Sequence, residues 1–275
     1  MTNMNTAGAE NLDNSTERQP HSRTHAATVP AVDVTGLVKR YGDTTAVDGV
    51  SLSIQPGETV GILGTNGAGK TTTVEMIAGL RTPTEGTVRV YGLDPFKDTA
   101  KVRQILGIQL QGANLHNALT VRELVELYAS FYPDPLSTAE AMDMVELTAK
   151  ADTRFEKLSG GQAQRLSVAL ALVGRPQAVI LDELTTGLDP RARRRIWSMI
   201  DSMQNQTVIL VSHAMDEVEN LCDRVALIDA GRIIAQGTPA ELATQAGASN
   251  LEDAFVALTG QEPGAIPVGE DEYDD

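Results

Sequence analysis

Hydrophobic residues along the chain form two patterns, one typical of strands and one typical of helices. Short, nearly continuous apolar runs bounded by glycine or polar residues predict strands that are buried on both faces. We expect strands at residues 32–38, 50–54, 59–63, 87–91, 178–181, 207–211 and 225–228. None of the apolar runs reaches the length that a membrane-spanning helix requires.

Apolar residues at helical spacing occupy most of the segments between these strands. We expect helices at residues 70–78, 121–131, 138–150, 191–203 and 215–221. The helices over 121–131 and 138–150 follow one another with no strand between them, which interrupts the alternation. The sequence therefore predicts an α/β fold whose parallel sheet is interrupted by an all-helical insert at about 112–160.

The two ends of the chain differ in composition from the middle. Residues 1–30 contain almost no large apolar side chain and show no secretory signal, and 261–275 contain six acids and no base. Segments of this kind bury too little apolar surface to fold. We expect disordered tails over 1–30 and 261–275, and one ordered domain over 31–260.

Composition limits the classes of protein to which the chain can belong. Of 275 residues, 41% are hydrophobic but only 4% are aromatic, so the core must be mainly aliphatic. The single cysteine, Cys222, excludes an intramolecular disulfide and fits a reducing compartment. The formal net charge of −15 argues against broad nucleic-acid binding, which needs a dense positive field. A local pocket for a phosphate remains compatible with this charge.

A glycine-rich loop between the expected strand 59–63 and helix 70–78 is the clearest chemical signal. It matches the pattern G-x-x-x-x-G-K-[ST] and consists of Gly64, Thr65, Asn66, Gly67, Ala68, Gly69, Lys70 and Thr71. Glycines let successive N–H groups face phosphate oxygens, and the following helix directs its positive end at the same anion. Lys70 can reach the β- and γ-phosphates, and the Thr71 hydroxyl can bind Mg²⁺. The alternative, a glycine-rich turn without a ligand, is disfavoured by the strand before it and the helix after it.

Two acids, Asp182 and Glu183, follow the buried strand 178–181. Open α/β sheets bind ligands at the carboxyl ends of their strands. Asp182 is therefore expected to hold Mg²⁺, and Glu183 to polarise the water that attacks the γ-phosphate. Acids are common at strand ends, so this interpretation depends on the phosphate-binding loop.

A second candidate anion site lies at the start of an apolar helix, where the sequence reads Leu158, Ser159, Gly160, Gly161 and Gln162. A hydroxyl, bare N–H groups and a helix N-terminus converge at such a turn. Taken alone, the segment favours the alternative interpretation, in which the serine caps the helix and the glycines only permit the bend.

With this LSGGQ segment the chain resembles the ATP-binding subunits of ABC (ATP-binding cassette) transporters, for which that segment is the signature sequence. The resemblance covers about residues 32–258. It implies the fold of a P-loop NTPase, with a mostly parallel sheet, an N-terminal antiparallel β region and an inserted α-helical subdomain. It also implies ATP and Mg²⁺ as ligands.

The resemblance assigns roles to further residues. Tyr41 matches the aromatic residue that stacks on adenine, and Thr72 extends the phosphate-binding segment. Gln111 matches the glutamine that joins metal and attacking water to the helical insert, and His213 the histidine that contacts the γ-phosphate. Residues 187–189 resemble the loop through which two nucleotide domains meet. Taken singly, Tyr41 fits a packing residue, Gln111 a solvated loop residue and His213 a polar group that closes a strand.

The implied mechanism requires two copies of the chain. Two ATP molecules are expected to lie between the phosphate loop of one copy and the signature segment 158–162 of the other. Hydrolysis then reopens the homodimer and drives a separate membrane-spanning permease, so the chain is expected to be peripheral at the cytoplasmic face of the membrane. Residues 231–239 and 251–260 resemble the branch that exports drugs, antibiotics and other hydrophobic compounds.

The sequence departs from the family pattern at Thr65 and Leu184, where proline is usual. Because neither position supplies a reactive group, we expect activity to persist. Two other functions stay open: a cassette ATPase that acts on ribosomes or nucleic acid, and a regulator that binds nucleotide without hydrolysing it. The single cassette without sustained heptads opposes the first, and the presence of Glu183 and His213 opposes the second. The absence of an Asn-Lys-x-Asp motif, which reads guanine, disfavours a GTPase more strongly than either of these alternatives.

Overall fold

The computed structural model of the chain describes residues 29–110, 115–203 and 206–260. These ranges leave out the whole of the expected tail 261–275, the expected tail 1–30 up to residue 28, and the candidate residue Gln111. The strands of the described part are β1 (Val32–Tyr41), β2 (Thr44–Ile54), β3 (Thr59–Leu63), β4 (Glu85–Val90), β5 (Leu106–Gln109), β6 (Ala178–Asp182), β7 (Thr207–Ser212), β8 (Arg224–Asp229) and β9 (Arg232–Gly237).

These strands form two sheets. The first is antiparallel, with the order β2-β1-β4, and it confirms the expected antiparallel β region at the N-terminal side of the fold. The second has the order β5-β6-β7-β3-β8-β9 and is parallel except for β9, which runs antiparallel to β8. Because β3 lies inside this second sheet, the loop that follows it is held on both sides by neighbouring strands.

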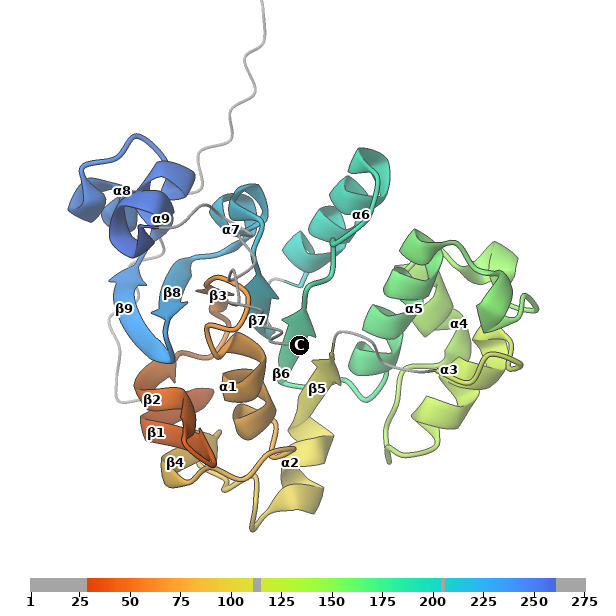
Figure 1. Cartoon of the computed structure of the whole chain (residues 1–275). Coiled ribbons are helices and arrows are strands. Elements are labelled where there is room, and N and C mark those ends of the chain that lie inside the picture. The colour runs from red at the N-terminus through yellow and green to blue at the C-terminus, as the bar shows by residue number, and fades with distance from the viewer. Residues whose placement is uncertain (1–28, 111–114, 204–205, 261–275) are drawn as a thin grey trace, which may run out of the picture.

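The helices of the described part are α1 (Lys70–Ile77), α2 (Thr99–Ile105), α3 (Val121–Ala129), α4 (Thr138–Met144), α5 (Gly160–Leu172), α6 (Pro190–Asp201), α7 (Met215–Leu221), α8 (Pro239–Ala246) and α9 (Leu251–Thr259). Figure 1 shows α3, α4 and α5 grouped beyond β5, at one side of the six-stranded sheet, as expected for a helical insert. Within the described ranges, no helix combines the length and apolar character needed to span a membrane.

Alternating residues of the central strands fill two separate hydrophobic cores. In β6, Val179 and Leu181 belong to the core that also contains the helical insert, α5, α6 and α7. Ala178 and Ile180 of the same strand belong to the core shared with α1 and the antiparallel sheet. Both faces of β6 are thus covered, which is why its sequence is a continuous apolar run.

Several segments differ from the sequence-based expectation: the helix over 138–150 is shorter, and β5, β9, α2, α8 and α9 were not expected. The helix expected over 138–150 ends at Met144, because Glu146 adopts a left-handed φ of 53° and a short 3₁₀ turn, Thr148–Lys150, follows it. The amide of Leu147 donates back to the carbonyl of Met142 at 2.8 Å, a bond typical of helix C-termini. The short strand β5 has no counterpart among the expected elements, because four residues directly after a helix give little periodic signal.

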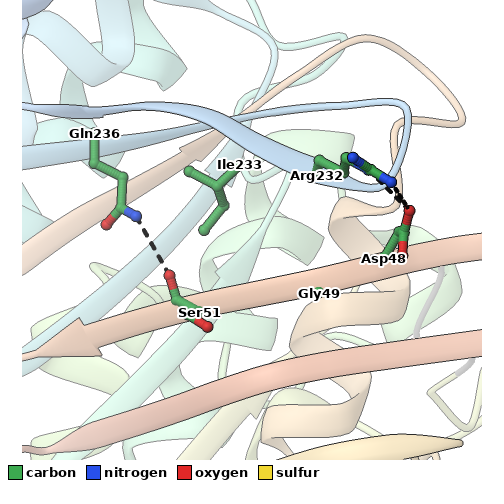
Figure 2. Close-up of a pocket in the computed structure, with 6 residues that line it drawn as sticks. All are labelled: Asp48, Gly49, Ser51, Arg232, Ile233 and Gln236. Atoms are coloured by element: carbon green, nitrogen blue, oxygen red, sulfur yellow. Dashed lines mark hydrogen bonds and ion pairs between the residues drawn. The ribbon is translucent and has the colours of Figure 1, made fainter.

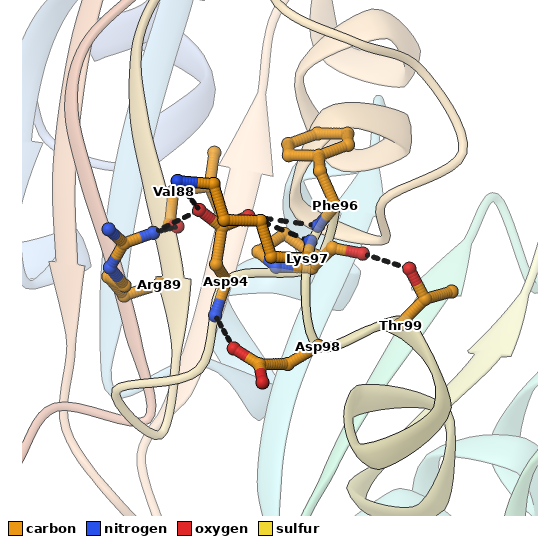
Figure 3. A network of polar contacts seen from close by, with 8 residues as sticks. Val88, Arg89, Asp94, Phe96, Lys97, Asp98 and Thr99 are labelled. Carbon is orange, nitrogen blue, oxygen red and sulfur yellow. Dashed lines mark hydrogen bonds and ion pairs between the residues drawn. The ribbon is translucent and has the colours of Figure 1, made fainter.

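A polar turn between β4 and α2 directs the chain towards β5 (Figure 3). The Asp94 carboxylate accepts hydrogen bonds from the amides of Phe96 (3.0 Å) and Lys97 (3.3 Å) and from the Arg89 guanidinium (2.7 Å). The amide of Asp94 in turn donates to the Asp98 carboxylate at 3.2 Å. These bonds fix the entry into α2 and hence the position of the edge strand that follows it.

Candidate functional site

The carboxyl ends of β3, β6 and β7 lie at one edge of the six-stranded sheet. In the register of the ladder, Leu63 of β3 is opposite Ser212 of β7, and Asp182 of β6 is opposite Val211 of β7. The segments that follow these residues therefore leave the sheet at the same level. The fold thus brings the phosphate loop, 64–71, together with the two acids and the histidine that the sequence singled out.

The phosphate loop has a shape that larger residues would not allow. A Cβ atom on Gly64 would lie 2.3 Å from the carbonyl oxygen of Ile228, and one on Gly69 would lie 2.4 Å from the carbonyl oxygen of Ala46. Gly69 also has a φ of 99°, which L side chains rarely adopt, and it precedes the first residue of α1. The loop is therefore packed closely against neighbouring backbone, with the N-terminus of α1 directed into it, an arrangement that favours anions.

Lys70 is buried in this loop and bonded to it. Its ammonium group donates to the carbonyl oxygens of Gly64 and Thr65, at 3.0 Å each. Burial lowers the pKa of the Lys70 amine, and the negative charges of Glu183 and Asp182 act in the opposite direction. The amine is thus held between the loop and the acidic strand end, where phosphate oxygens would meet it.

Asp182 and Glu183 occupy different environments although they are adjacent. Both carboxylate oxygens of Asp182 are buried, and its amide donates to the side-chain oxygen of Gln109 at 3.0 Å. The carboxylate of Asp182 and the hydroxyl of Thr71, which is exposed at the start of α1, are ligands of the kind that Mg²⁺ binds. The donor set at this edge therefore fits a magnesium ion.

Glu183 lies next to His213. Its Oε1 is 3.4 Å from Nδ1 of His213, and its side chain is 12% exposed against 35% for the histidine. The backbone of Glu183 has a φ of 50°, an uncommon value for a residue with a side chain. Its amide donates to the carbonyl of Val211 at 2.9 Å, which holds this strained turn against β7.

The signature segment 158–162 forms the N-terminus of α5. The Ser159 hydroxyl accepts a hydrogen bond from the amide of Gln162 at 3.4 Å, and the Gln162 side chain accepts one from the amide of Ser159 at 3.0 Å. Ser159 is therefore a helix cap, one of the two interpretations that the sequence left open, and its own proton stays available for another acceptor. In Figure 1, α5, which begins with this turn, lies well apart from α1, which follows the phosphate loop.

The two glycines of the signature segment have different surroundings. A Cβ atom on Gly160 would meet nothing within 4 Å, so this position is open to the outside. A Cβ atom on Gly161 would lie 3.2 Å from the Cβ of Ala192 in α6. Gly160 thus offers bare backbone at the surface, whereas Gly161 permits close packing of α5 on α6.

Tyr41 lies at the end of β1 with 42% of its surface exposed. The ammonium of Lys39 lies 5.1 Å from its ring centroid, and the guanidinium carbon of Arg81 lies 5.5 Å from it. Such positions are typical of cation–π contacts. The exposed ring fits a stacking role as well as it fits packing, and the cations lie where an anionic ligand would be attracted.

Thr65 and Leu184, the two departures from proline, both have structural functions. Thr65 acts through its carbonyl oxygen, which accepts from the Lys70 ammonium and from the amide of Ala68, and proline has the same carbonyl. Leu184 is fully buried in the core that contains α5 and α6. Neither substitution removes a group that faces the phosphate loop.

A surface groove of about 530 Å³ between β2 and β9 is separate from this set of residues (Figure 2). Its lining consists of Asp48, Gly49, Ser51, Arg232, Ile233 and Gln236. The Arg232 guanidinium is already paired with the Asp48 carboxylate. The groove includes none of the candidate site residues and offers no free cation to an anion.

The sequence reasoning did not identify Gln109, Ser212 and Glu217. The side-chain oxygen of Gln109 accepts a hydrogen bond from the amide of Asp182, and the Ser212 hydroxyl donates one to the Glu217 carboxylate at 2.7 Å. Glu217 is an acid on the face of α7 that otherwise holds apolar side chains such as Leu221, four residues on. The signal available in the sequence was therefore an acid at an apolar position of the helical repeat.

Comparison with known proteins shows the family to which the chain belongs. Residues 47–186 match the family model described as "ABC transporter". The Nod factor export ATP-binding protein I of Ralstonia nicotianae is 40% identical over 222 residues, which are 78% of this chain and 69% of that protein. The protein of the same name from Paraburkholderia xenovorans is 40% identical over 244 residues, 86% of this chain and 79% of that protein.

Solved structures show the same fold. A structure described as the ATP-binding subunit of an ABC transporter has a TM-score of 0.76 at 26% identity, and the match covers 83% of this chain and 99% of that one. A dimeric ATP-binding cassette in a post-hydrolysis state, bound to ADP and Pi, has a TM-score of 0.69 at 29% identity, covering 75% and 98%. The chain therefore belongs to the ABC transporter family as an ATP-binding subunit, an ATPase whose hydrolysis of ATP drives transport.

Proposed function

We propose that two copies of this chain bind two ATP molecules between them and drive export through a separate membrane-spanning permease. The proposal rests on one observation, the common edge at which the phosphate loop, Asp182 with Glu183, and His213 meet. These groups surround a bound triphosphate from one side only. Completion of the site therefore requires groups from elsewhere.

Nucleotide is held, in this proposal, by the phosphate loop and by Tyr41. The adenine stacks on the exposed ring of Tyr41, and the loop amides with the Lys70 ammonium bind the phosphates. The binding segment comprises Gly64, Thr65, Asn66, Gly67, Ala68, Gly69, Lys70, Thr71 and Thr72. To reach a phosphate, the ammonium of Lys70 exchanges its bonds to the carbonyls of Gly64 and Thr65 for stronger, charge-assisted ones.

Thr71, Asp182 and Gln111 are the proposed ligands of Mg²⁺. The ion would supply positive charge that neutralises the phosphate oxygens. Asp182 suits this position because its carboxylate is buried at the strand end beside Lys70, and because the Gln109 side chain fixes the backbone of Asp182. Gln111 lies outside the described residues, and its proposed role comes from the resemblance and from its place in the sequence two residues after β5.

Glu183 is the proposed general base. Its carboxylate accepts a proton from the water that attacks the γ-phosphorus, while the bond to the β-phosphate oxygen breaks and phosphate leaves. His213 lies within 3.4 Å of that carboxylate and orients it together with the γ-phosphate. Positioning of this kind is the main source of catalysis in phosphoryl transfer.

The second copy supplies Ser159, Gly160, Gly161 and Gln162. The open backbone at Gly160 and the remaining hydroxyl proton of Ser159 would approach the γ-phosphate from the side opposite to Glu183. ATP then bridges the two copies, and its hydrolysis removes the bridge. A ligand that makes contacts in the closed dimer only shifts the equilibrium towards that state.

The helical insert is the proposed contact with the permease. Leu127 of α3 and Phe131 just after it expose 43% and 61% of their surfaces, an apolar surface suited to another protein. The chain would thus be peripheral at the cytoplasmic face of the membrane. Export is supported by the names of the relatives. Drugs or other hydrophobic compounds are the proposed cargo class, from the resemblance of residues 231–239 and 251–260.

Phosphate release by the purified chain and by Glu183→Gln tests this proposal. We expect the substitution to lower the rate by at least about 100-fold, because the carboxamide cannot accept the proton. We also expect the variant to form a dimer in saturating Mg-ATP, measured by light scattering. Glu252→Gln, which alters an exposed acid in α9, is the charge control. Equal rates for the wild type and Glu183→Gln, or a variant that stays monomeric, would overturn the proposal.

A further inference from the structure

Glu217 is a fully buried acid that the mechanism above does not use. It lies on α7, and none of its surface is exposed. A buried carboxylate is costly unless hydrogen bonds replace its water. The groups that supply those bonds therefore indicate what this residue does.

Three side chains, one from α6, one from β7 and one from the loop between β6 and α6, direct hydrogen bonds to Glu217. The Ser212 hydroxyl is 2.7 Å from its Oε2, and the indole nitrogen of Trp197 is 3.2 Å from its Oε1. The Thr185 side chain also bonds to the carboxylate. Burial raises the pKa of Glu217, and the bonds from Ser212, Thr185 and Trp197 lower it.

The direction of these bonds requires an acceptor at position 217. The Ser212 oxygen already accepts the amide proton of Ala214 at 3.0 Å, so its own proton is free to be donated to Glu217. The indole of Trp197 can only donate. A carboxylate satisfies all of these donors, whereas a carboxamide would turn an NH₂ group towards one of them.

Two of the three donors flank the proposed catalytic pair. Ser212 immediately precedes His213, and its bond to the amide of Ala214 spans that residue. Thr185 follows Glu183 by two residues. One buried carboxylate is thus bonded to both segments whose ends bring Glu183 and His213 to 3.4 Å from one another.

We propose that Glu217 is a positioning residue for ATP hydrolysis, which fixes the segments around Glu183 and His213 through Thr185 and Ser212. The inference rests on the proposed roles of Glu183 and His213. The hydrogen bonds to the Glu217 side chain come from Ser212, Thr185 and Trp197, and none of these residues belongs to the phosphate loop. Removal of Glu217 therefore alters the geometry of the catalytic pair and leaves nucleotide binding unchanged.

Kinetic constants of Thr185→Val, Ser212→Ala and Glu217→Gln test the inference. Each should lower kcat by about 10-fold or more, since small displacements of a catalytic group are costly. KM for Mg-ATP should stay within about 2-fold, because the change lies in the transition state only. The double variant Ser212→Ala, Glu217→Gln should have nearly the same kcat as Glu217→Gln alone, because both substitutions affect the same hydrogen bond between Ser212 and Glu217.

Trp197→Phe is the matched variant within the same cluster. It removes one donor from the same carboxylate, but from α6, which contains neither Glu183 nor His213. We expect it to lower kcat by less than about 3-fold while lowering the melting temperature as much as Ser212→Ala does. All rates are measured well below the lowest melting temperature of the set.

Two failures can be told apart by including Glu183→Gln. If Glu183→Gln hydrolyses ATP at the wild-type rate, the proposed function fails. If Glu183→Gln is inactive but Thr185→Val and Ser212→Ala retain the wild-type kcat, only the positioning role of Glu217 fails. The positioning role would also be overturned if kcat fell in proportion to the melting temperature in every variant, including Trp197→Phe.

Discussion

Replacement of Gly160 by alanine separates the stability of the fold from its proposed function. Gly160 is the first residue of α5, and a Cβ atom there meets nothing within 4 Å. Alanine in a helix is more stable than glycine by about 0.5–1 kcal/mol. For a domain of this size, that gain raises the melting temperature by about 1–4 °C.

The same substitution should impair hydrolysis. In the proposed dimer the γ-phosphate of one copy approaches the bare backbone at Gly160 of the other, and a methyl group there holds it away. Loss of such a contact to a reacting phosphate costs about 10- to 100-fold in kcat. Gly160→Ala should thus be more stable than the wild type and less active.

Gly161→Ala is the matched comparison. Its Cβ would lie 3.2 Å from the Cβ of Ala192, so α6 must shift by a few tenths of an ångström. Overpacking typically costs about 1–3 kcal/mol, which cancels or reverses the gain in helix stability. We expect the melting temperature of this variant to be equal to that of the wild type or lower.

The assays are thermal unfolding by circular dichroism, phosphate release, and light scattering in Mg-ATP with Glu183→Gln as background. A Gly160→Ala protein that hydrolyses ATP at the wild-type rate would refute the proposed contact between Gly160 and the second copy. A fall of several degrees in its melting temperature would refute the conclusion that the position is open.

Two further predictions concern the core. Leu184→Ala should lower the free energy of unfolding by about 2–5 kcal/mol in urea titrations, because Leu184 is fully buried in the core with α5 and α6; a loss below about 1 kcal/mol would contradict this packing. Burial raises the pKa of the Cys222 thiol well above its ordinary value, so a thiol-specific reagent should react at neutral pH only after unfolding. The unfolded protein has a Cys222 thiol with the ordinary pKa, and the folded protein has one with a raised pKa. The contribution of this thiol to stability is therefore fully present below the ordinary pKa and is lost as the pH rises towards the raised pKa. Rapid labelling of the native protein would contradict both expectations.

Local signals were strong enough to predict much of the fold. The strand Thr59–Leu63 and the helix Met215–Leu221 have the expected bounds, because a buried apolar run and an amphipathic repeat are each complete within a few residues. The helix expected over 138–150 was wrong in its second half. There Glu146 leaves the helix and bonds to Arg165, which is distant in sequence.

The sequence alone determined the chemistry available to the protein. The loop from Gly64 to Thr71, the acids after β6 and the LSGGQ segment are each contiguous in the sequence. The loop could be recognised by itself, whereas the acids and the LSGGQ segment were interpreted together with it. Their residue types fix which groups can bind phosphate or accept a proton.

Only the tertiary structure decided how these groups are held. The distance between Glu183 and His213 depends on the pairing of β6 with β7. The burial of Glu217 depends on donors from α6, from β7 and from the loop between β6 and α6. Contacts of this kind join residues far apart in the chain, and no local pattern encodes them, because they form only when the sheet and its helices pack together.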